Sequence, residues 1–348
     1  MNELQGILAD TVNRLFTDQV TQTLRESAEK GEWPGELWRQ VEEGGLTLPQ
    51  IPESCGGAGG SWQDAHIVVT AAGRFAAPLP LAETMVGAWL LAESGLDVPT
   101  GPLTVAPALP SDRLELTRDG SGWRLRGVAT RVPWGRSAKH VVVATGDMIA
   151  LVPAGNGRVE PDVNLALEPR DTLRWENAPV AAAARAGARA ANGPRLYGAL
   201  VRSAQMAGGL EYLLSQTVRY VSERKQFGRP IGSFQAIQHQ LALLAGHAAA
   251  AGIAAANAFR AADRGDATFE IAAAKVRTGE AAGLGAGIAH QCHGAIGFTY
   301  EHSLHFVTRR LWSWRAEFGA ESQWAAQLGR DIALHGADGL WPYLTARP

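Results

Sequence analysis

Residues 220–238 read Tyr220-Val-Ser-Glu-Arg224-Lys-Gln-Phe227-Gly228-Arg-Pro-Ile231-Gly232-Ser-Phe234-Gln235-Ala-Ile-Gln238, and this stretch decides how the rest of the sequence is interpreted. Gly228 and Pro230 interrupt a run of helix formers, so one helix is predicted to end near Arg224 and another to start after Ser233. A planar guanidinium can bind a pyrophosphate through two hydrogen bonds. Basic residues at the C-terminal end of a helix are also favoured by the helix dipole alone, so Arg224 in isolation has two interpretations.

The sequence on both sides of this stretch predicts long helices. Pro230 is the only proline between Pro194 and Pro342, and proline is the residue that most strongly breaks a helix interior. Apolar residues recur at three-, four- and seven-residue spacing from Leu196 to Leu214, which marks one buried helical face. We predict a C-terminal four-helix-type bundle with helices over residues 194–222, 233–263, 266–294, 303–315 and 318–334.

The middle of the chain consists of short apolar runs separated by Asp-Gly and Gly-Asp turns. Runs at 114–117 and 123–127 flank one turn, and runs at 140–144 and 148–152 flank another, a pattern that predicts an antiparallel sheet or a small barrel. The first hundred residues look helical again, around Leu37, Trp38 and Val41 before a glycine-rich break and over Ala71–Leu91 after it. The predicted fold is therefore mostly α with a central β domain. Its parts are an N-terminal helical domain over 1–100, a middle β domain over 101–183 and a C-terminal helical bundle over 184–348.

The composition excludes several classes of protein. Apolar residues make up 46% of the 348 residues and charged residues 19%, which is typical of a globular chain. The net charge of −2 gives no basic excess for binding nucleic acid or an anionic membrane. Because there is neither a leader-like N-terminus nor an unbroken apolar stretch of 18 residues, we expect a cytoplasmic protein without a membrane span. Cys55 and Cys292 cannot build a disulfide framework, and neither they nor His293, His302 and His305 have metal-site spacing, so no metal is expected.

Two glycine-rich stretches do not match nucleotide-binding loops. Residues 56–60 lack the Gly-Lys-Ser/Thr ending of a phosphate loop, and residues 283–287 lack the last glycine of G-x-G-x-x-G. We interpret the first stretch as a tight turn and the second as a place where helices pack closely. A dinucleotide would therefore have to bind in another way.

Three motifs together resemble those of the acyl-CoA dehydrogenase family. The stretch over residues 220–238 resembles the family pattern Arg-x-x-Phe-Gly-x-x-Ile-x-x-Phe-Gln, which is highly specific. The family's Gln-x-x-Gly-Gly-x-Gly-Tyr/Phe motif corresponds to Gln291-Cys-His-Gly294-Ala295-Ile-Gly297-Phe298, and a third motif to Glu43-Gly-Gly45-Leu46 with Pro52-Glu53-x-x-Gly56-Gly57-x-Gly59. The motifs lie at family spacing and the helical–β–helical order also matches, so the resemblance covers essentially the full chain.

The resemblance implies that FAD is bound between subunits. Arg224 would contact the pyrophosphate, Phe234 would flank the adenosine half, and Ala295 replaces the second glycine of its motif. The residues expected to bind FAD are Arg224, Gln226, Phe227, Phe234, Gln235, Gln291, Cys292, His293, Gly294 and Ala295. An isolated monomer would hold half a site, so a homo- or hetero-tetramer is expected.

On the substrate side the sequence departs from the family in three places. The loop Thr-Glu-Pro-x-x-Gly-Ser-Asp is replaced by the shorter Val105-Ala-Pro-Ala-Leu-Pro110-Ser-Asp112. The strand Gly-x-Lys-x-Trp/Phe-Ile-Thr is rewritten as Gly127-Val-Ala-Thr-Arg131-Val-Pro-Trp134, in which Trp134 either stacks near the flavin or fills the sheet core. The arginine that lines the family's acyl pocket is best matched by Arg202, about one turn from its usual place.

The general base is the least regular part of the resemblance. Dehydrogenation needs a carboxylate against the Cα–H of the thioester, on the side opposite the flavin. The usual base position, 27 residues after Gln291, falls on Phe318, and an alternative position, 26 residues before Arg224, falls on Gly198. Glu317 is one residue early, and we take it as the candidate base with a pKa raised toward working pH. Glu317 and Glu321 can equally be solvated carboxylates at the start of a helix.

The resemblance implies an FAD-dependent acyl-CoA dehydrogenase. Such an oxidoreductase introduces a 2,3 double bond into an acyl-CoA thioester, passes a hydride to the flavin and delivers electrons to an electron-transfer flavoprotein or a similar acceptor. The absent glutamate at positions 318 and 198 leaves an alternative, a non-catalytic subunit that completes the FAD site of a heteromeric enzyme. A flavin oxidase or monooxygenase on the same fold is a third possibility. The shortened loop favours a bulky or ring-bearing substrate, as in fatty acid or steroid catabolism.

Overall fold

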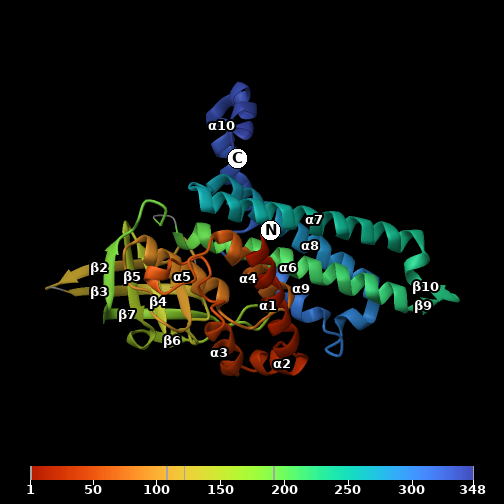
Figure 1. Cartoon of the computed structure of the whole chain (residues 1–348), viewed down its shortest axis with the longest axis horizontal. Coiled ribbons are helices and arrows are strands. Elements are labelled where there is room, and N and C mark those ends of the chain that lie inside the picture. The colour runs from red at the N-terminus through yellow and green to blue at the C-terminus, as the bar shows by residue number, and fades with distance from the viewer. Residues whose placement is uncertain (1, 107–108, 121, 191–192, 348) are drawn as a thin grey trace.

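The computed structural model describes residues 2–106, 109–120, 122–190 and 193–347. Figure 1 shows the N-terminal helices in red to orange, the strands in yellow to green and the C-terminal helices in green to blue. The strands occupy one end of the molecule, the N-terminal helices lie between that end and the middle, and the long helices extend to a small hairpin at the opposite end (Figure 1). The fold is mostly α with a sheet-containing middle domain, as the sequence predicts.

The N-terminal layer is helical but contains one break that the sequence analysis missed. Its helices are α1 Glu3–Gln19, α2 Gln22–Glu29, α3 Gly35–Glu43, α4 Trp62–Arg74 and α5 Leu81–Glu93, with a 3-10 turn at Glu53–Cys55. The stretch over 71–91 is helical at both ends as expected, but Pro78 and Pro80 interrupt it and separate α4 from α5. Gly57 lies where a Cβ atom would overlap the backbone of Ile51, so the glycine-rich stretch is the tight turn that was predicted.

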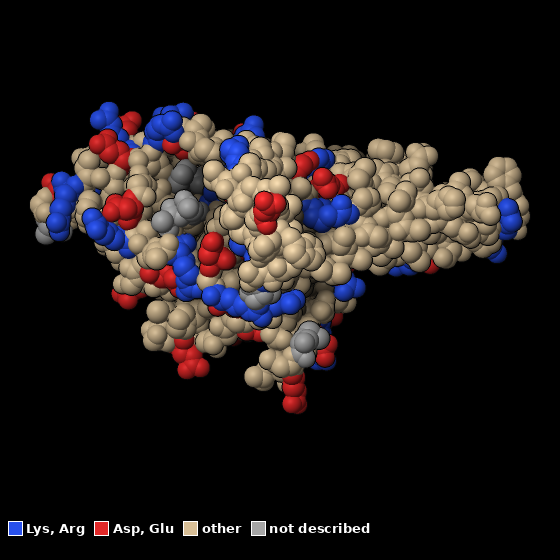
Figure 2. Space-filling model, turned by 90° about the horizontal axis from the view of Figure 1, so that it is seen from above, with Lys and Arg blue, Asp and Glu red and all other residues tan. Residues whose placement is uncertain are grey.

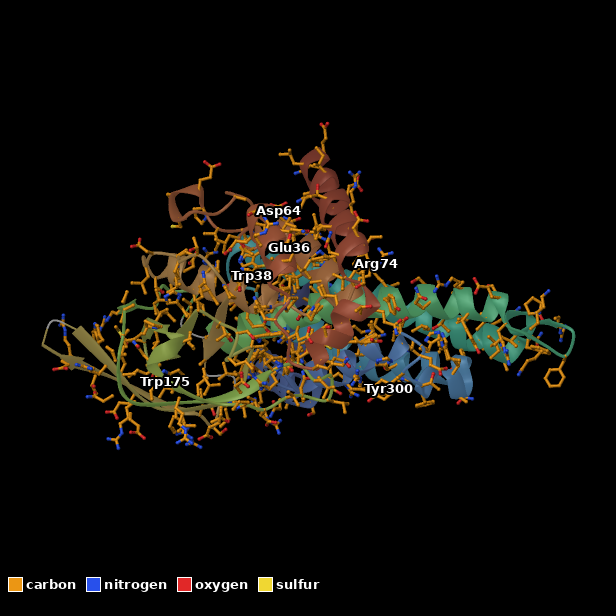
Figure 3. All side chains as sticks on the ribbon, turned by 90° about the horizontal axis from the view of Figure 1, so that it is seen from below. Glu36, Trp38, Asp64, Arg74, Trp175 and Tyr300 are labelled. Atoms are coloured by element: carbon orange, nitrogen blue, oxygen red, sulfur yellow. The ribbon has the colours of Figure 1, made fainter. Side chains whose placement is uncertain are left out.

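The middle domain consists of two four-stranded sheets that face each other. Its strands are β1 Leu103–Ala106, β2 Arg113–Asp119, β3 Gly122–Pro133, β4 His140–Thr145, β5 Met148–Pro153, β6 Arg158–Glu160, β7 Arg170–Pro179 and β8 Ala182–Arg185. The sheets have the orders β1-β4-β5-β8 and β2-β3-β7-β6, and a shared apolar core lies between them. Figure 3 labels Trp175 among these strands, far from Tyr300 in the helical half. The expected antiparallel pairing holds except between β1 and β4, which are parallel.

The C-terminal half is a bundle of long helices. They are α6 Gly193–Glu223, α7 Gln235–Arg264, α8 Thr268–His293, α9 Leu304–Ala316 and α10 Glu321–Thr345. Their ends lie within three residues of the predicted ends, except that α10 continues well past the predicted 334 with a kink at Gly336. Among the described residues, α7 alone is long and apolar enough to cross a membrane, and it packs in the bundle through Leu244, Ala248 and Ala251.

The N-terminal layer docks on the bundle through a close crossing of α4 and α6. Gly73 of α4 lies against the backbone carbonyl of Gln205, and Gly208 of α6 lies against that of Thr70. A Cβ atom at either glycine would fall well inside van der Waals contact with the opposing backbone. The crossing holds the two helices at a separation that only glycine permits, and it fixes where the next turns of α6 meet the other domains.

We predict that Gly208→Ala lowers the free energy of unfolding by about 1–3 kcal/mol, because an overpacked contact with a backbone atom cannot relax by a rotamer change. Gly6→Ala is the matched control, because nothing lies near that position of α1. The control is expected to be neutral or to stabilise by up to about 1 kcal/mol, since alanine is the better helix former. Chemical denaturation measures both, and equal stabilities of the two variants would contradict the tight crossing.

Candidate functional site

A hollow at the far end of the bundle is built around the hairpin that follows α6. Lys225–Gln226 (β9) pairs with Arg229–Pro230 (β10), and the turn residues Phe227 and Gly228 both have left-handed backbone angles, as a tight two-residue hairpin turn requires. The second wall is the end of α8, where Gly294 adopts a positive φ and stops the helix. The hollow has a volume of about 620 Å³.

The hollow gathers nine of the ten residues that the sequence assigned to FAD. The nine are Arg224, Gln226, Phe227, Phe234, Gln291, Cys292, His293, Gly294 and Ala295, and they come from two motifs that are far apart in the sequence. Gln235 does not line the hollow and lies next to it as the first residue of α7. Ile231, the isoleucine of the first motif, also lines the hollow, and Tyr220, Ile237 and Ile296 are further lining residues that the motif patterns do not specify.

The chemistry of the hollow fits one half of a dinucleotide. Among the described residues, the Arg224 side chain has no hydrogen bond or ion pair, so its guanidinium is available for a pyrophosphate. Phe227 is 90% exposed, which is unusual for so large an apolar side chain and leaves its ring open to a second surface. The site is thus open to solvent on the side where a neighbouring chain would complete it.

Cys292 and His293 form the wall of the hollow. Both side chains are buried, and burial raises the pKa of the Cys292 thiol and lowers the pKa of the His293 imidazole, so both are neutral near pH 7. The imidazole stacks on Tyr220 with ring centroids 4.4 Å apart, and its Nδ1 lies 2.7 Å from the carbonyl oxygen of Ala289. These two residues therefore shape the hollow, while Arg224, Gln226 and Gln291 supply its exposed polar groups.

A second cavity, of about 310 Å³, lies between the β domain and α9. Its lining combines strand residues with the turn that follows α9: Leu109, Arg131, Pro133, Asp162, Val163, Asn164, Leu165, Arg170, Trp312, Ser313, Ala316, Glu317 and Phe318. Pro107 and Ala108 of the rewritten loop lie outside the described residues. Trp134 is buried, donates its backbone N–H to the carbonyl oxygen of Pro169 and does not line the cavity, and the choice between its two interpretations stays a prediction.

Glu317 lies on the wall of this cavity, and both of its carboxylate oxygens accept hydrogen bonds. Its Oε1 accepts hydrogen bonds from Arg170 Nε at 2.7 Å and Asn164 Nδ2 at 3.1 Å. Its Oε2 accepts from Arg202 Nε at 2.7 Å and Arg170 Nη2 at 3.0 Å. Two guanidiniums therefore hold the carboxylate in one orientation, and one of them binds it bidentately.

The ion pairs of Glu317 belong to a larger buried cluster of three arginines and three glutamates. Arg202 also pairs with Glu83 of α5, and its side chain is 1% exposed. The expectation that Arg202 lines an acyl pocket is therefore wrong, because its guanidinium is buried and forms ion pairs with Glu83 and Glu317. Glu168 completes the cluster, and three groups donate to it: Arg170 Nη2 at 2.9 Å, Arg310 Nε at 3.2 Å and Trp314 Nε1 at 3.0 Å.

The electrostatics of Glu317 contradict the expectation of a raised pKa. Burial alone would raise the pKa of its carboxyl group, but the adjacent Arg170 and Arg202 outweigh burial and lower that pKa from 4.5 to about 2. A general base works best with a pKa near the operating pH. Glu317 is thus ionised but very weakly basic, and a proton on either oxygen would have to displace a guanidinium.

The two positions where the family carries its base face each other. The ring of Phe318 packs against Gly198 so closely that a Cβ atom at Gly198 would overlap it. Phe318 is 3% exposed, so an apolar ring occupies the space between the two positions. Glu321 pairs with Arg315 at the start of α10 and does not line the cavity, as expected for a carboxylate at a helix N-terminus.

Lys275 is a further buried charge that the sequence did not point to. Its side chain is 0% exposed, and its Nζ donates to the carbonyl oxygens of Trp314 at 3.2 Å and Arg315 at 2.7 Å. It thereby holds the last turn of α9 immediately before Glu317. Burial lowers the pKa of Lys275 to about 7. The described residues contain no group of three or more His, Cys, Asp or Glu placed to hold a metal ion.

Comparison with known proteins finds the same family at both ends of the chain. The family model described as acyl-CoA dehydrogenase, N-terminal domain, matches residues 2–97, and the one described as acyl-CoA dehydrogenase, C-terminal domain, matches residues 185–333. Acyl-CoA dehydrogenase IpdE2 of Mycobacterium tuberculosis is 32% identical, and the alignment covers 79% of each chain. Acyl-CoA dehydrogenase FadE34 of the same organism is 32% identical over 83% of this chain, which spans 41% of the FadE34 length.

A solved structure shares the whole fold. The ChsE4-ChsE5 complex from Mycobacterium tuberculosis is 26% identical to this chain with a TM-score of 0.86, and the superposition covers 96% of this chain and 98% of that one. Its printed description names two different chains in one complex. The similarity therefore extends through the N-terminal helices, the β domain and the bundle.

We predict that Glu317→Gln destabilises the protein by about 3–5 kcal/mol at pH 7, because it leaves the three buried arginines of the cluster with only two glutamates, and so one positive charge uncompensated. The wild-type protein should also lose about 3 kcal/mol as the pH falls from about 5 to about 2, since the folded pKa lies below the unfolded value of 4.5. Chemical denaturation from pH 2 to 8 measures both effects. Glu321→Gln is the control, with one half-exposed partner and an expected loss of at most about 1 kcal/mol. A Glu317→Gln protein as stable as this control would refute the buried cluster.

Proposed function

The chain belongs to the acyl-CoA dehydrogenase family, and we propose that it acts there as the subunit that completes an FAD site for a partner chain carrying the general base. The family consists of FAD-dependent oxidoreductases that act on CH–CH bonds, so FAD is the cofactor. The chain would then contribute binding and orientation of FAD, while proton removal from the thioester falls to the partner. The reaction of the assembly is the 2,3-dehydrogenation of an acyl-CoA.

The observation that carries this proposal is the state of Glu317. A base must be free to approach the Cα–H of the substrate, whereas this carboxylate accepts four hydrogen bonds and has a pKa of about 2. Phe318 and Gly198, which occupy the two family positions, pack against each other and hold no carboxylate. The described part of the chain offers no other carboxylate on the wall of this cavity except Asp162, which belongs to the β domain.

The FAD hollow supports the same division of roles. When bound, FAD accepts the hydride that leaves Cβ of the thioester. Arg224 would hold the pyrophosphate by charge-assisted hydrogen bonds, and the exposed Phe227 would contact the partner chain or the adenosine half. Unlike Glu317, Arg224 has no side-chain partner among the residues that the structure describes, so its guanidinium would be free to bind FAD in an assembly.

A second candidate function, catalysis by this chain, is favoured by one observation. Glu317 is 15% exposed and lies on the wall of the 310 Å³ cavity beside Phe318. If substrate binding pulled Arg170 away, the carboxylate would be freed at the cavity surface. This route requires a buried guanidinium to lose its partner, which is the reason we rank it second.

The remaining features of the proposed assembly follow from the family and the loop. We propose a cytoplasmic homo- or hetero-tetramer that transfers electrons to an electron-transfer flavoprotein or a similar acceptor. The substrate is a bulky or ring-bearing acyl-CoA, because the loop that closes over the substrate in the family is shortened here. The two-chain ChsE4-ChsE5 complex supports a heteromeric arrangement.

We predict that Arg224→Ala weakens FAD binding by about 10- to 100-fold, the effect of removing a charge-assisted bidentate contact. Arg185→Ala is the matched control, because Arg185 is an exposed arginine of β8 in the β domain. Fluorescence titration of the purified protein with FAD measures both affinities. Unchanged FAD affinity in the Arg224→Ala variant would contradict the proposal that the pyrophosphate binds in this hollow.

The proposed and the second function differ in what the chain does alone. We predict that the purified chain, reconstituted with FAD, shows no bleaching of flavin absorbance with any member of an acyl-CoA panel in anaerobic buffer. If the chain bleaches its flavin and Glu317→Gln slows this by 10²–10⁴-fold, Glu317 is the base and the second function holds. Oxygen consumption without an added acceptor would point instead to an oxidase.

A further inference from the structure

The segment between α8 and α9 forms one wall of the FAD hollow. It comprises the 3-10 turn η4 Gly294–Phe298 and the loop that leads to α9, and we refer to residues 294–303 as the wall segment. Ala295 and Ile296 line the hollow, whereas Phe298 is 71% exposed and Tyr300, labelled in Figure 3, is 75% exposed. Because so much of the wall segment is exposed, its position depends on the contacts made at its two ends.

Histidines make the contacts at both ends of the wall segment. At the end of α8, the His290 ring stacks on Phe298 and on Trp312, with ring centroids 4.4 and 5.5 Å away. Immediately before α9, the backbone N–H of Leu304 donates to His302 Nδ1 at 3.2 Å. Two imidazoles thus fasten the wall segment to the helices on either side of it.

The hydrogen bond from Leu304 fixes the protonation state of His302. An imidazole nitrogen accepts a hydrogen bond only when it carries no proton, so Nδ1 is bare and the ring is neutral. A proton on Nδ1 would place two N–H donors against each other at the first turn of α9, where the helix dipole also disfavours a positive charge. A neutral His302 can therefore hold the wall segment in this position, and a charged one cannot.

The His302 imidazole lies beside further imidazoles. The ring of His293, a wall residue of the FAD hollow that is 4% exposed, packs edge-on against it with centroids 4.8 Å apart. His305 Nδ1 donates to the backbone carbonyl oxygen of His302 at 2.9 Å. Among the described residues, the Nε2 atoms of His293 and His305 are buried without a hydrogen-bond partner. The site is thus built for neutral rings, because an imidazolium needs a partner for each of its two N–H groups.

The charged groups around these imidazoles do not compensate for a further positive charge. The titratable groups of the neighbouring elements are Arg219, Tyr212 and Tyr220 from α6, Cys292 from α8, Arg309 and Arg310 from α9, Glu29 from α2 and the exposed Glu301. Of the two carboxylates, Glu29 already pairs with Arg309, and Glu301 is exposed to solvent. A proton taken up by His302 therefore adds a charge that is repelled by Arg219.

The electrostatics agree with this geometry. Burial, together with nearby positive or titrating groups, lowers the pKa values of His290, His293 and His302 from the ordinary value of 6.5. A histidine whose pKa is lower in the folded than in the unfolded state stabilises the fold fully above pH 6.5, and this contribution is lost as the pH falls through the folded pKa. The wall segment is thus fastened at neutral pH and loosened in acid.

We infer that His302 is a proton sensor that opens the wall segment and releases FAD when the pH falls. Protonation breaks the hydrogen bond from Leu304 and places a positive charge beside His293, so the wall segment detaches from α9 and the hollow loses one side. This inference rests on the proposed FAD site and adds a regulation of that site by pH.

The direction of the effect distinguishes opening from simple charge attraction. Figure 2 shows blue atoms at the right-hand tip of the bundle, where the β9–β10 hairpin carries Lys225 and Arg229 beside the hollow. A further positive charge near a pyrophosphate would by itself strengthen FAD binding in acid. FAD binding that becomes weaker in acid therefore indicates that the wall has moved.

The first test is a fluorescence titration of the full chain with FAD between pH 5 and pH 8. The wild-type affinity should be constant above about pH 7 and fall in acid by up to about 10-fold per pH unit, the limit for uptake of one proton. His302→Ala should bind FAD more weakly at every pH, because Leu304 loses its acceptor. His302→Asn should restore binding and abolish the pH dependence, because its Oδ1 accepts the same hydrogen bond and does not titrate.

The matched control is His335→Asn, because His335 is an exposed histidine of α10, outside the hollow. This variant should keep the pH dependence of the wild type. A wild-type affinity that is equal at pH 7.5 and pH 5.5, or a His302→Asn protein that loses as much affinity as the wild type, would overturn the inference.

A second test needs no FAD. In the NMR spectrum of the chain labelled with ¹³C-histidine, the signal that is missing from His302→Asn should titrate with a midpoint below 6.5, and a midpoint at or above 6.5 would contradict the sensor. Amide exchange of residues 294–303, corrected for the intrinsic effect of pH, should be faster at pH 5.5 than at pH 7.5 in the wild type but not in His302→Asn. If these changes occur and no sample binds FAD at any pH, the assigned FAD site is wrong while the opening of the wall segment is confirmed.

Discussion

The structure depends on the bonds that Glu317 makes with Arg170 and Arg202. A carboxylate and two guanidiniums this deeply buried are stable only when each charge is paired, and the pairing here joins all parts of the chain. Glu83 brings in the N-terminal layer, Glu168 and Arg170 the β domain, and Arg202 and Arg310 the bundle. The positions of the three domains relative to one another are thus set by one neutral group of six charges.

The same pairing explains why the two sites of the chain differ in chemical character. At the domain junction both oxygens of Glu317 already accept hydrogen bonds from arginines, and a carboxylate in that condition cannot also exchange protons with a substrate. At the β9–β10 hairpin the reverse holds, because Arg224 and Phe227 are exposed and have little to bind within their own chain. The polar groups at the domain junction are therefore paired with one another, whereas those at the β9–β10 hairpin are exposed and available to bind another molecule.

The sequence predicts those features that depend on neighbouring residues better than those that depend on contacts between residues far apart in the chain. The helix ends on either side of the β9–β10 hairpin and the turn at Gly57 are set by local glycine and proline, and short motifs predict them, whereas the break at Pro78 and Pro80 was missed although it is equally local. The partners of Glu317 lie 115 and 147 residues away, and no local pattern marks Arg170 or Glu168 as members of the cluster. For this reason the pKa of Glu317 was expected to be raised, whereas it is lowered. The parallel pairing of β1 with β4 likewise arises from a return across the other sheet, which spacing does not reveal.

The contact between Phe318 and Gly198 has a consequence for how this chain can evolve. A glutamate at position 318 alone would replace a packed ring with a smaller charged group facing an apolar void, and a glutamate at position 198 alone would collide with the ring. Each single substitution toward the family pattern is therefore disfavoured by the residue at the other position. Such mutual dependence is epistasis, and it entrenches the absence of the carboxylate: a chain acquiring it one substitution at a time would have to pass through a destabilised intermediate.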